Sequence, residues 1–521
     1  MPILKPLSDR LLRSWLRCRR RAWLDRHGPL EQRQWSAHRA LALDDQLRCF
    51  QLLLPRRPGH GVAACERGDE GVVGVRLFSS LSTPSGPLPL EAHPPLLQKV
   101  SGSSRWGGHA YRPVLARQGR NLTREHRLTL ALWGWMLAEL QKSEVPRALA
   151  LGRGMHGLEQ EQLPLTPALQ RQLEESLQRL AGELRSSEPP PLVSDRKKCV
   201  LCSWRGLCDG TAAAEGHLSE VSGIGGKRRD MLLDLGITSL SQLAGSDPSA
   251  LADSLAVHGE QHREVAPQLV AQARVQASGR ERRRDGQGAL SLPALPELRH
   301  APGVLIYDIE ADPDARDDFL HGVLRLERDS DHNWPTGPQA AAAASLDGLG
   351  QLRGRYQPLL ALQEHGEERL WLRLQRLLDR HPDWPVLHYG ETESINLLRL
   401  AERQGLPLSD RDRLRARLID VHQRLRRHWL LPVNSYGLKA VAGWQGFRWS
   451  QQGVDGARCL LWWRQWRQQR HGSSGAGQIT RSSLRLQRIF TYNRDDCLAT
   501  WVVARWLLDR DDALEATGGE S

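Results

Sequence analysis

Residues 303–312, GVLIYDIEAD, place an apolar run directly before two acids. The letters VLIY are typical of a strand that is buried on both faces. Asp308 and Glu310 stand at positions i and i+2, so on a strand both side chains point to one face. Two carboxylates that face the same way repel each other unless cations lie between them. The segment therefore predicts a central strand of a buried sheet with a cation-binding end.

Further acids occur in later segments of the chain. Glu393 follows the apolar stretch PVLHYG, Asp420 lies in LIDVHQ, and the last helical pattern begins with TYNRDDCLAT. On a helix Tyr492 and Asp496 share a face, because they are four residues apart, whereas Asp495 is expected to be a solvated neighbour. Carboxylates from several elements can hold two divalent ions that hydrolyse a phosphodiester. Hard oxygen ligands of this kind favour two Mg²⁺ or Mn²⁺ ions.

The order of these motifs resembles the DEDDy branch of the RNase H-like exonucleases. SYGLKAVAGWQGFRW and YNRDDCLATWVV are similar to the YprB-type RNase H-like domain, over roughly residues 300–512. The resemblance implies 3′→5′ exonuclease activity with Asp308, Glu310 and Asp496 as metal ligands. It also implies catalytic roles for Glu393, which stands where the family usually has aspartate, and for Tyr492, which would orient water. Asp420 is a further candidate ligand.

The cysteines are expected to be reduced, because disulfides are rare in a long chain of cytosolic character. Four of the eight stand alone and are expected to be buried apolar residues: Cys49, Cys65, Cys459 and Cys497. Three others form a C-x2-C-x5-C group: Cys199, Cys202 and Cys208. Only Cys18, in WLRCRRRAWL, could supply a fourth thiolate from a comparable setting.

A single N-terminal cysteine with such a triplet resembles the iron–sulfur RecB-like nucleases, including AddB and the CRISPR-associated exonucleases, over roughly residues 1–212. The resemblance implies one 4Fe–4S cluster on Cys18, Cys199, Cys202 and Cys208; a Zn²⁺ staple is the alternative. The family's catalytic positions do not match. Pro95 stands in place of an aspartate, and Leu115-Ala116-Arg117 stands in place of acid-x-lysine. Leucine cannot bind a metal ion and arginine cannot act as a base, so we expect an inactive domain kept for DNA binding or architecture.

Residues 217–245 resemble a helix–hairpin–helix. Gly223 and Gly225 permit a tight turn whose N–H groups can face a phosphate at a helix N-terminus. Lys227, Arg228 and Arg229 add positive charge directly after it. The segment predicts contact with the nucleic-acid backbone that is independent of sequence; a protein-interaction hairpin of similar shape is the alternative.

The formal net charge of +12 also favours a polyanionic partner. No apolar run approaches the ~20 residues that span a bilayer, and the N-terminus lacks the apolar core of a signal peptide. We therefore expect a cytoplasmic protein with no membrane partner. Two polar stretches, residues 335–350 and 473–478, are expected to be loops.

We expect an α/β multidomain protein with four parts. They are a degenerate PD-(D/E)xK RecB-like domain (residues 1–212), a helix–hairpin–helix unit (213–275), a linker (276–300) and an RNase H-like α/β domain (301–521). The expected function is metal-dependent hydrolysis of nucleic acid in repair, recombination or processing, with DNA favoured over RNA. The alternative is a catalytically degraded nucleic-acid-binding or scaffold subunit of a repair complex. The sequence identifies no particular helicase or repair partner.

Overall fold

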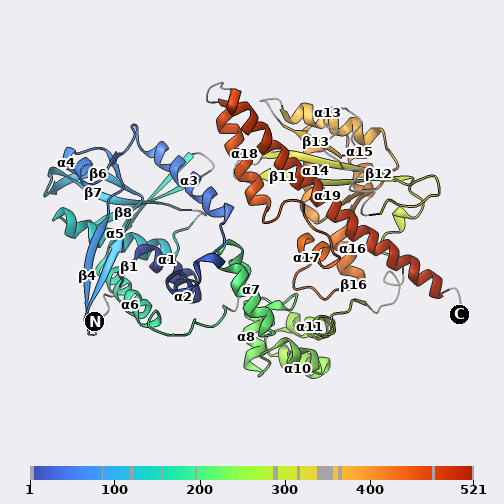
Figure 1. Ribbon diagram of the computed structural model, residues 1–521, viewed down its shortest axis with the longest axis horizontal. Helices are drawn as coiled ribbons and strands as arrows, with labels where there is room; N and C mark the ends of the chain where they lie inside the picture. Colours follow the sequence, from blue (N-terminus) through green and yellow to red (C-terminus); the bar gives the residue numbers. More distant parts are fainter. Residues whose placement is uncertain are drawn as a thin grey trace. The chain divides into compact units, whose positions relative to one another are not determined.

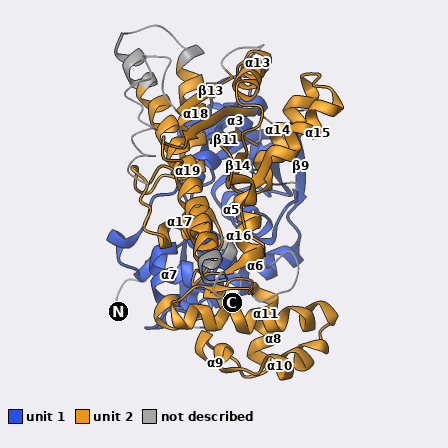
Figure 2. Cartoon of the chain, turned by 90° about the vertical axis from the view of Figure 1, so that its right-hand side faces the viewer, with its two compact units in different colours: residues 1–212 blue, residues 213–521 orange. Residues whose placement is uncertain are grey.

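The computed structural model describes residues 5–84, 86–117, 119, 121–154, 157–193, 196–284, 292–313, 317–336, 356–361, 366–471 and 476–518. The chain divides into two compact units, Met1–Ala212 and Ala213–Ser521 (Figure 2). Each unit combines helices with β-sheet, so the expected α/β class is confirmed. No helix in the described part of the chain has the length and hydropathy that a membrane crossing requires.

The first unit is built on a six-stranded sheet of order β2-β3-β6-β7-β8-β9 (Figure 1). Its strands are β2 (Gly59–His60), β3 (Gly71–Val73), β6 (Leu96–Ser104), β7 (Gly107–Ala116), β8 (Arg147–Gly154) and β9 (Gly157–Pro164). A second sheet contains β1 (Leu7–Ser8), β5 (Gly86–Ala92) and β4 (Leu77–Thr83). The helices are α1 (Asp9–Arg17), α2 (Arg19–His27), α3 (Ala37–Leu53), α4 (Val62–Arg67), α5 (Arg124–Gln141), α6 (Pro167–Glu183) and α7 (Arg205–Ala214).

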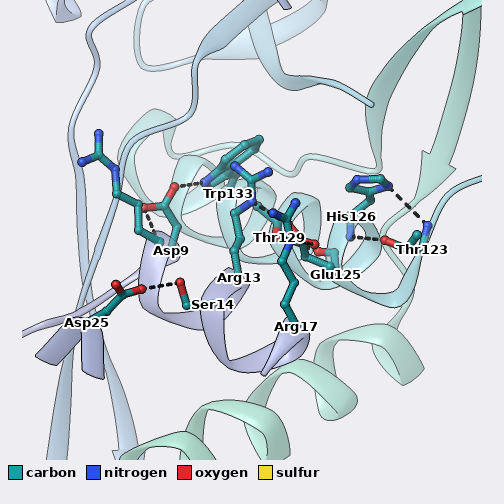
Figure 3. Close-up of polar contacts among 11 residues, drawn as sticks. Asp9, Arg13, Ser14, Arg17, Asp25, Thr123, Glu125, His126, Thr129 and Trp133 are labelled. Atoms are coloured by element: carbon teal, nitrogen blue, oxygen red, sulfur yellow. Dashed lines mark hydrogen bonds and ion pairs between the residues drawn. The ribbon is translucent and has the colours of Figure 1, made fainter. Parts of the chain in front are cut away.

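A buried polar network joins α1 to α5 in this unit (Figure 3). Asp9 accepts a hydrogen bond of 2.8 Å from Trp133 Nε1. Glu125 accepts from Arg13 Nε at 3.0 Å and from Arg17 Nε at 2.5 Å. Burial raises the pKa of Glu125, but the two guanidinium groups outweigh it and lower the pKa overall. Both acids therefore hold α1 against α5 (Figure 3).

The second unit contains a five-stranded sheet of order β13-β12-β11-β14-β15 (Figure 1). The strands are β11 (Gly303–Asp312), β12 (Asp317–Glu327), β13 (Tyr356–Leu360), β14 (Val386–His388) and β15 (Leu418–Asp420). β12 pairs antiparallel with both β11 and β13, whereas β14 is parallel to both β11 and β15. The strand predicted to be central is the middle strand of this sheet.

Each face of β11 packs against a different layer of helices. Val304 and Ile306 contact α19 (Ala476–Gly518) in one core cluster. Leu305 and Tyr307 lie in another cluster with α13 (Gly366–Asp379) and α14 (Glu391–Arg403). Because side chains alternate along a strand, the even-numbered acids that follow, Asp308 and Glu310, share the face that α19 covers.

Several shorter elements complete the second unit. After α14 come α15 (Leu408–Arg417), α16 (Val421–His428), β16 (Trp429–Leu430), α17 (Leu438–Trp444) and α18 (Gly456–His471). Before the sheet, α8 (Gly226–Asp234), α9 (Leu240–Gly245), α10 (Pro248–Ala256) and α11 (Glu260–Ser278) surround an apolar core of their own. Of the two expected loops, residues 337–350 and 473–475 lie outside the described residues, and residues 476–478 already belong to α19.

The segment 276–300 was expected to be a linker, but its described residues are attached to the C-terminal domain. Strand β10 (Arg282–Arg283) pairs antiparallel with β16, and Leu295 and Leu298 are buried in the domain core. Gln272, on α11, donates to Leu431 O at 2.8 Å. Residues 285–291 lie outside the described part. The helical segment and the sheet domain therefore belong to one unit.

Candidate metal centre

Three carboxylates meet above the end of β11. Asp308, Glu310 and Asp496 each place one ligand oxygen within 4.8 Å of the others. The first two come from β11 and the third from α19, so the predicted group is assembled by one sheet face and its covering helix. Within the described residues, no other cluster of three His, Cys, Asp or Glu ligand atoms is this tight.

The three acids are buried close together, and this raises the pKa of each of them. Burial raises the pKa of Asp308 well above its usual value, and the charges of Asp496 and Glu310 add to the shift. Burial and Asp496 likewise raise the pKa of Glu310, against a smaller opposing effect of Lys439. Burial raises the pKa of Asp496 to about 6, although a hydrogen bond from Trp449 favours its charged form. Three hard oxygen donors with this much unrelieved repulsion suit a divalent cation.

Two side chains that the sequence analysis did not single out orient these carboxylates. Asn493 is fully buried on α19, and its Nδ2 donates to Asp308 Oδ2 at 2.7 Å. Its Oδ1 accepts from Tyr356 OH at 2.8 Å, which fixes the amide orientation. Trp449 Nε1 donates to Asp496 Oδ1 at 2.7 Å. Outer hydrogen bonds of this kind hold metal ligands in one geometry.

Tyr492 lies one helical turn before Asp496, and its side chain hydrogen-bonds to that carboxylate. The ring is buried. Burial, followed by the charges of Asp496 and Glu310, raises the pKa of Tyr492, so the phenol keeps its proton and acts as a donor. Lys439, on α17, places Nζ 4.9 Å from the centre of this ring and donates to Val454 O at 2.6 Å.

Glu393 lies in the first turn of α14, a helix whose N-cap is Gly390. Its Oε2 is buried and has no hydrogen-bond partner among the described residues. Burial raises the pKa of Glu393 to about 7, and the charges of Asp420 and Asp496 contribute. Glu393 is not a member of the close group of three, but its charge contributes to the raised pKa values of Asp308 and Glu310.

Asp420 is used differently. Its Oδ1 accepts from Gly390 N at 3.0 Å and from Gln423 N at 3.1 Å, so the side chain caps α16 and holds the turn after β14. It lies outside the close group of three carboxylates.

The expectation of a solvated Asp495 is wrong. This side chain is only 3% exposed. It accepts from Ser450 N at 2.8 Å and Ser450 Oγ at 2.6 Å, and it pairs with Arg494 at 2.6 Å. The segment around Ser450 covers this turn of α19, and Asp495 anchors that segment beside Asp496.

The four predicted cluster cysteines lie in the first unit. Cys18 caps α2, accepting from Arg21 N at 3.4 Å, whereas Cys199, Cys202 and Cys208 lie in and after a 3₁₀ turn (Arg196–Leu201) and in α7. Burial raises the pKa of Cys199 to about 11, and the nearby Cys18 and Cys202 thiols contribute. The remote cysteine and the triplet are therefore neighbours, but the cluster itself stays a prediction. The four solitary cysteines are buried, as expected: Cys49, Cys65, Cys459 and Cys497.

The catalytic positions of the RecB-like pattern hold no metal-binding trio among the described residues of the first unit. Leu115 is 1% exposed and belongs to the apolar core. Arg117 is buried and pairs with Glu159 at 3.2 Å and with Glu161 at 3.8 Å. Arg117 therefore stands where the RecB-like pattern has its lysine, and its guanidinium group forms ion pairs with the acids nearby.

The glycine turn before α8 has the expected local geometry. Gly223 has φ +95°, a conformation that side chains disfavour, and Gly225 is the N-cap of α8. Lys227, Arg228 and Arg229 occupy the first turn of this helix. Arg228 donates to Gly223 O at 2.8 Å and so braces the turn. Cations at a helix N-terminus oppose the macrodipole, and a bound anion would offset this.

Comparisons with known proteins place one part of the chain in a superfamily. Residues 305–508 match the family model of the RNase H superfamily (RNase_H_2), a range that holds all three clustered carboxylates, Glu393 and Tyr492. A solved structure described as "Crystal structure of SSO0001" is 11% identical, with a TM-score of 0.23, over 40% of this chain and 88% of that chain. At that TM-score the likeness carries no argument. No curated protein matches the chain.

Proposed function

From a C-terminal RNase H-like domain with three clustered carboxylates, we propose that this protein is a metal-dependent nuclease that hydrolyses phosphodiester bonds. The observation that carries the proposal is the approach of the Asp308, Glu310 and Asp496 oxygens to within 4.8 Å of one another. Folding alone gives no reason to gather buried acids whose charges repel. The superfamily of this domain supports the same conclusion.

Asp308, Glu310 and Asp496 would hold Mg²⁺ or Mn²⁺, with Glu393 as the additional carboxylate in place of the usual aspartate. Two such ions supply a nucleophilic water and neutralise charge on the scissile phosphate. The chain's own groups set the geometry. Asn493 orients Asp308 and Trp449 orients Asp496, while the hydroxyl group of Tyr492, beside Asp496, would orient the attacking water.

The finer assignment is 3′→5′ exonuclease activity on DNA, independent of sequence, in repair, recombination or processing. It rests on the resemblance of the D-x-E and Y-x-x-x-D motifs to the DEDDy exonucleases. Gly223, Gly225, Lys227, Arg228 and Arg229 would contact the substrate backbone through the α8 turn. The first unit would serve as an inactive RecB-like domain, stapled by a 4Fe–4S cluster on its four neighbouring cysteines or by Zn²⁺.

A nuclease assay with labelled substrates tests the proposal. Purified protein would be incubated with end-labelled single- and double-stranded DNA and RNA, with EDTA, Mg²⁺ or Mn²⁺. Metal-dependent shortening from the 3′ end is the expected result, and the preferred substrate identifies DNA or RNA. Binding without cleavage in every metal would instead support the alternative of a degraded scaffold subunit.

A further inference from the structure

A basic cavity of about 1360 Å³ lies in the second unit, beside the ends of the parallel strands β14 and β15. One part of its lining consists of four arginines from β10, the residue after it, and the last turn of α16: Arg282, Arg284, Arg426 and Arg427. Another part is the uncharged face of α11, with Pro267, Gln268 and Ala271. Cavities for small molecules have volumes of ~300–1,000 Å³, so this one has room for a longer ligand.

Three of these arginines have no carboxylate partner among the described residues. No carboxylate of the described chain forms an ion pair with Arg284, Arg426 or Arg427. Arg284 Nε is buried without a hydrogen-bond partner. Burial and the nearby charge of Arg426 lower the pKa of Arg284. Arg426 and Arg427 are favoured at the C-terminus of α16 by the helix dipole. The dipole does not explain why Arg284, which follows β10, lies in the same lining.

Part of the cavity lining lies next to Glu393, because a Cβ atom on Gly390 would be 3.6 Å from Glu393 Oε2. The lining includes Gly390 and Asp420, at the ends of the parallel strands β14 and β15. Glu393 follows Gly390 by one turn of α14, and its pKa is raised by both Asp420 and Asp496. Glu393 therefore lies beside a residue of the cavity lining and within electrostatic reach of Asp496.

We propose that this cavity binds the backbone phosphates of a single strand of nucleic acid whose end reaches the carboxylates. Guanidinium groups bind phosphate oxygens strongly and in fixed geometry. A positively charged groove that follows the phosphate backbone is the feature that proteins binding single strands without sequence preference share. The inference rests on the proposed function, which makes nucleic acid the ligand.

The test measures binding without cleavage, in EDTA, by fluorescence anisotropy of a labelled single-stranded oligonucleotide across a salt series. Each phosphate contact of a single strand contributes about 0.7 to the slope of log K against log salt concentration. The full-length double variant Arg426→Gln/Arg427→Gln should bind at least tenfold more weakly at low salt and lose about 1.4 of this slope. The Arg426→Lys/Arg427→Lys variant should keep the slope, because the charges remain.

The control is Arg373→Gln/Arg376→Gln, which removes two exposed arginines from one face of α13. It should retain the wild-type slope. Equal losses in both Gln pairs, an unchanged slope in the cavity pair, or equally tight binding of free nucleotides would each overturn the cavity proposal. Thermal unfolding of each variant shows whether weaker oligonucleotide binding comes from misfolding. If the Gln pair is misfolded, binding by the Arg426→Lys/Arg427→Lys variant tests the proposal.

Failure of the cavity proposal is distinct from failure of the proposed function. Wild-type protein that binds with the expected slope but cuts nothing in Mg²⁺ or Mn²⁺ would contradict the nuclease and leave the binding site. If the wild-type protein cuts and the Arg426→Gln/Arg427→Gln variant binds and cuts equally well, the role of the cavity is contradicted and the nuclease assignment stands.

Discussion

A Cβ atom on Gly322 would lie 1.6 Å from Asn493 Oδ1. Gly322 is on β12, directly opposite Asp308 of β11, and Asn493 is on α19. The glycine thus opens the space in which the buried amide reaches Asp308 Oδ2 at 2.7 Å. One strand position without a side chain lets a helix orient a metal ligand on the neighbouring strand.

Asn493→Ala should reduce metal-dependent cleavage by about tenfold to a hundredfold, the usual cost of losing a group that orients a metal ligand. Gly322→Ala should act in the same direction, because the new methyl group displaces the Asn493 amide. Cleavage rates over a Mn²⁺ titration would measure both effects. Asn396→Ala is the matched control, since Asn396 donates to Asp318, outside the carboxylate group. A wild-type rate for Asn493→Ala would show that the amide has no part in the site.

Tyr492→Phe should slow turnover by less than the loss of a metal ligand and leave the Mn²⁺ dependence nearly unchanged. The reason is that the phenol lies beside Asp496 and stays protonated, so it donates a hydrogen bond and does not bind the ion as a phenolate. Single-turnover rates at saturating metal separate this effect from metal binding. A Tyr492→Phe protein that needs far more Mn²⁺ would contradict the role.

Metal-free protein should lose stability as the pH rises, because Asp496 and Glu393 titrate in the folded state near pKa values of about 6 and about 7. Their unfolded values are 3.8 and 4.5. A raised folded pKa leaves no penalty below the unfolded value. Above the folded value the full cost of the buried charge appears, to which the neighbouring carboxylates add. Added Mn²⁺ should therefore raise the melting temperature more at about pH 8 than at about pH 5. If Mn²⁺ raised the melting temperature equally at both pH values, or raised that of the Asp308→Asn variant as much as that of wild type, the stabilising ion would bind elsewhere.

Protein purified without oxygen should be brown and contain about four iron and four sulfide per chain, if the cysteines of the first unit hold a 4Fe–4S cluster. Cys18→Ala should bleach the colour and make the first unit more sensitive to protease, because the ligated thiols join its N-terminal and C-terminal segments. Cys49→Ala is the control, since that thiol is buried elsewhere in α3. Colourless protein with one zinc per chain would exclude the 4Fe–4S cluster and support a structural Zn²⁺ site.

The sequence predicted the carboxylates that cluster because two periodicities expose them. Alternation places Asp308 and Glu310 on one face of β11, and helical spacing places Tyr492 and Asp496 on one face of α19. Asn493 was missed, although it stands three residues before Asp496 and is likewise on that face. A glycine inside the strand pattern FLHGVL was the other available signal, because such a glycine often marks a close approach of another group.

Other features depend on tertiary contacts that no local pattern contains. The burial of Asp495 follows from the segment at Ser450, 45 residues earlier in the chain. The linker prediction for residues 276–300 relied on Gly, Pro and charged residues, yet β10 finds its partner in β16, far along the sequence. The basic cavity likewise combines α11, β10 and α16, none of which is suggestive alone.

The most direct test of the account compares metal-dependent cleavage by Asp308→Asn and Asp496→Asn with that of wild type. Each change removes one negative charge from the group of three carboxylates and leaves its shape. The account predicts that both variants fold, bind an oligonucleotide in EDTA as wild type does, and lose cleavage by more than about a hundredfold, beyond the cost of an outer residue. Asp412→Asn, which removes a charge from the exposed helix α15, should cut normally. Wild-type cleavage by both Asp308→Asn and Asp496→Asn would contradict the assignment of this site.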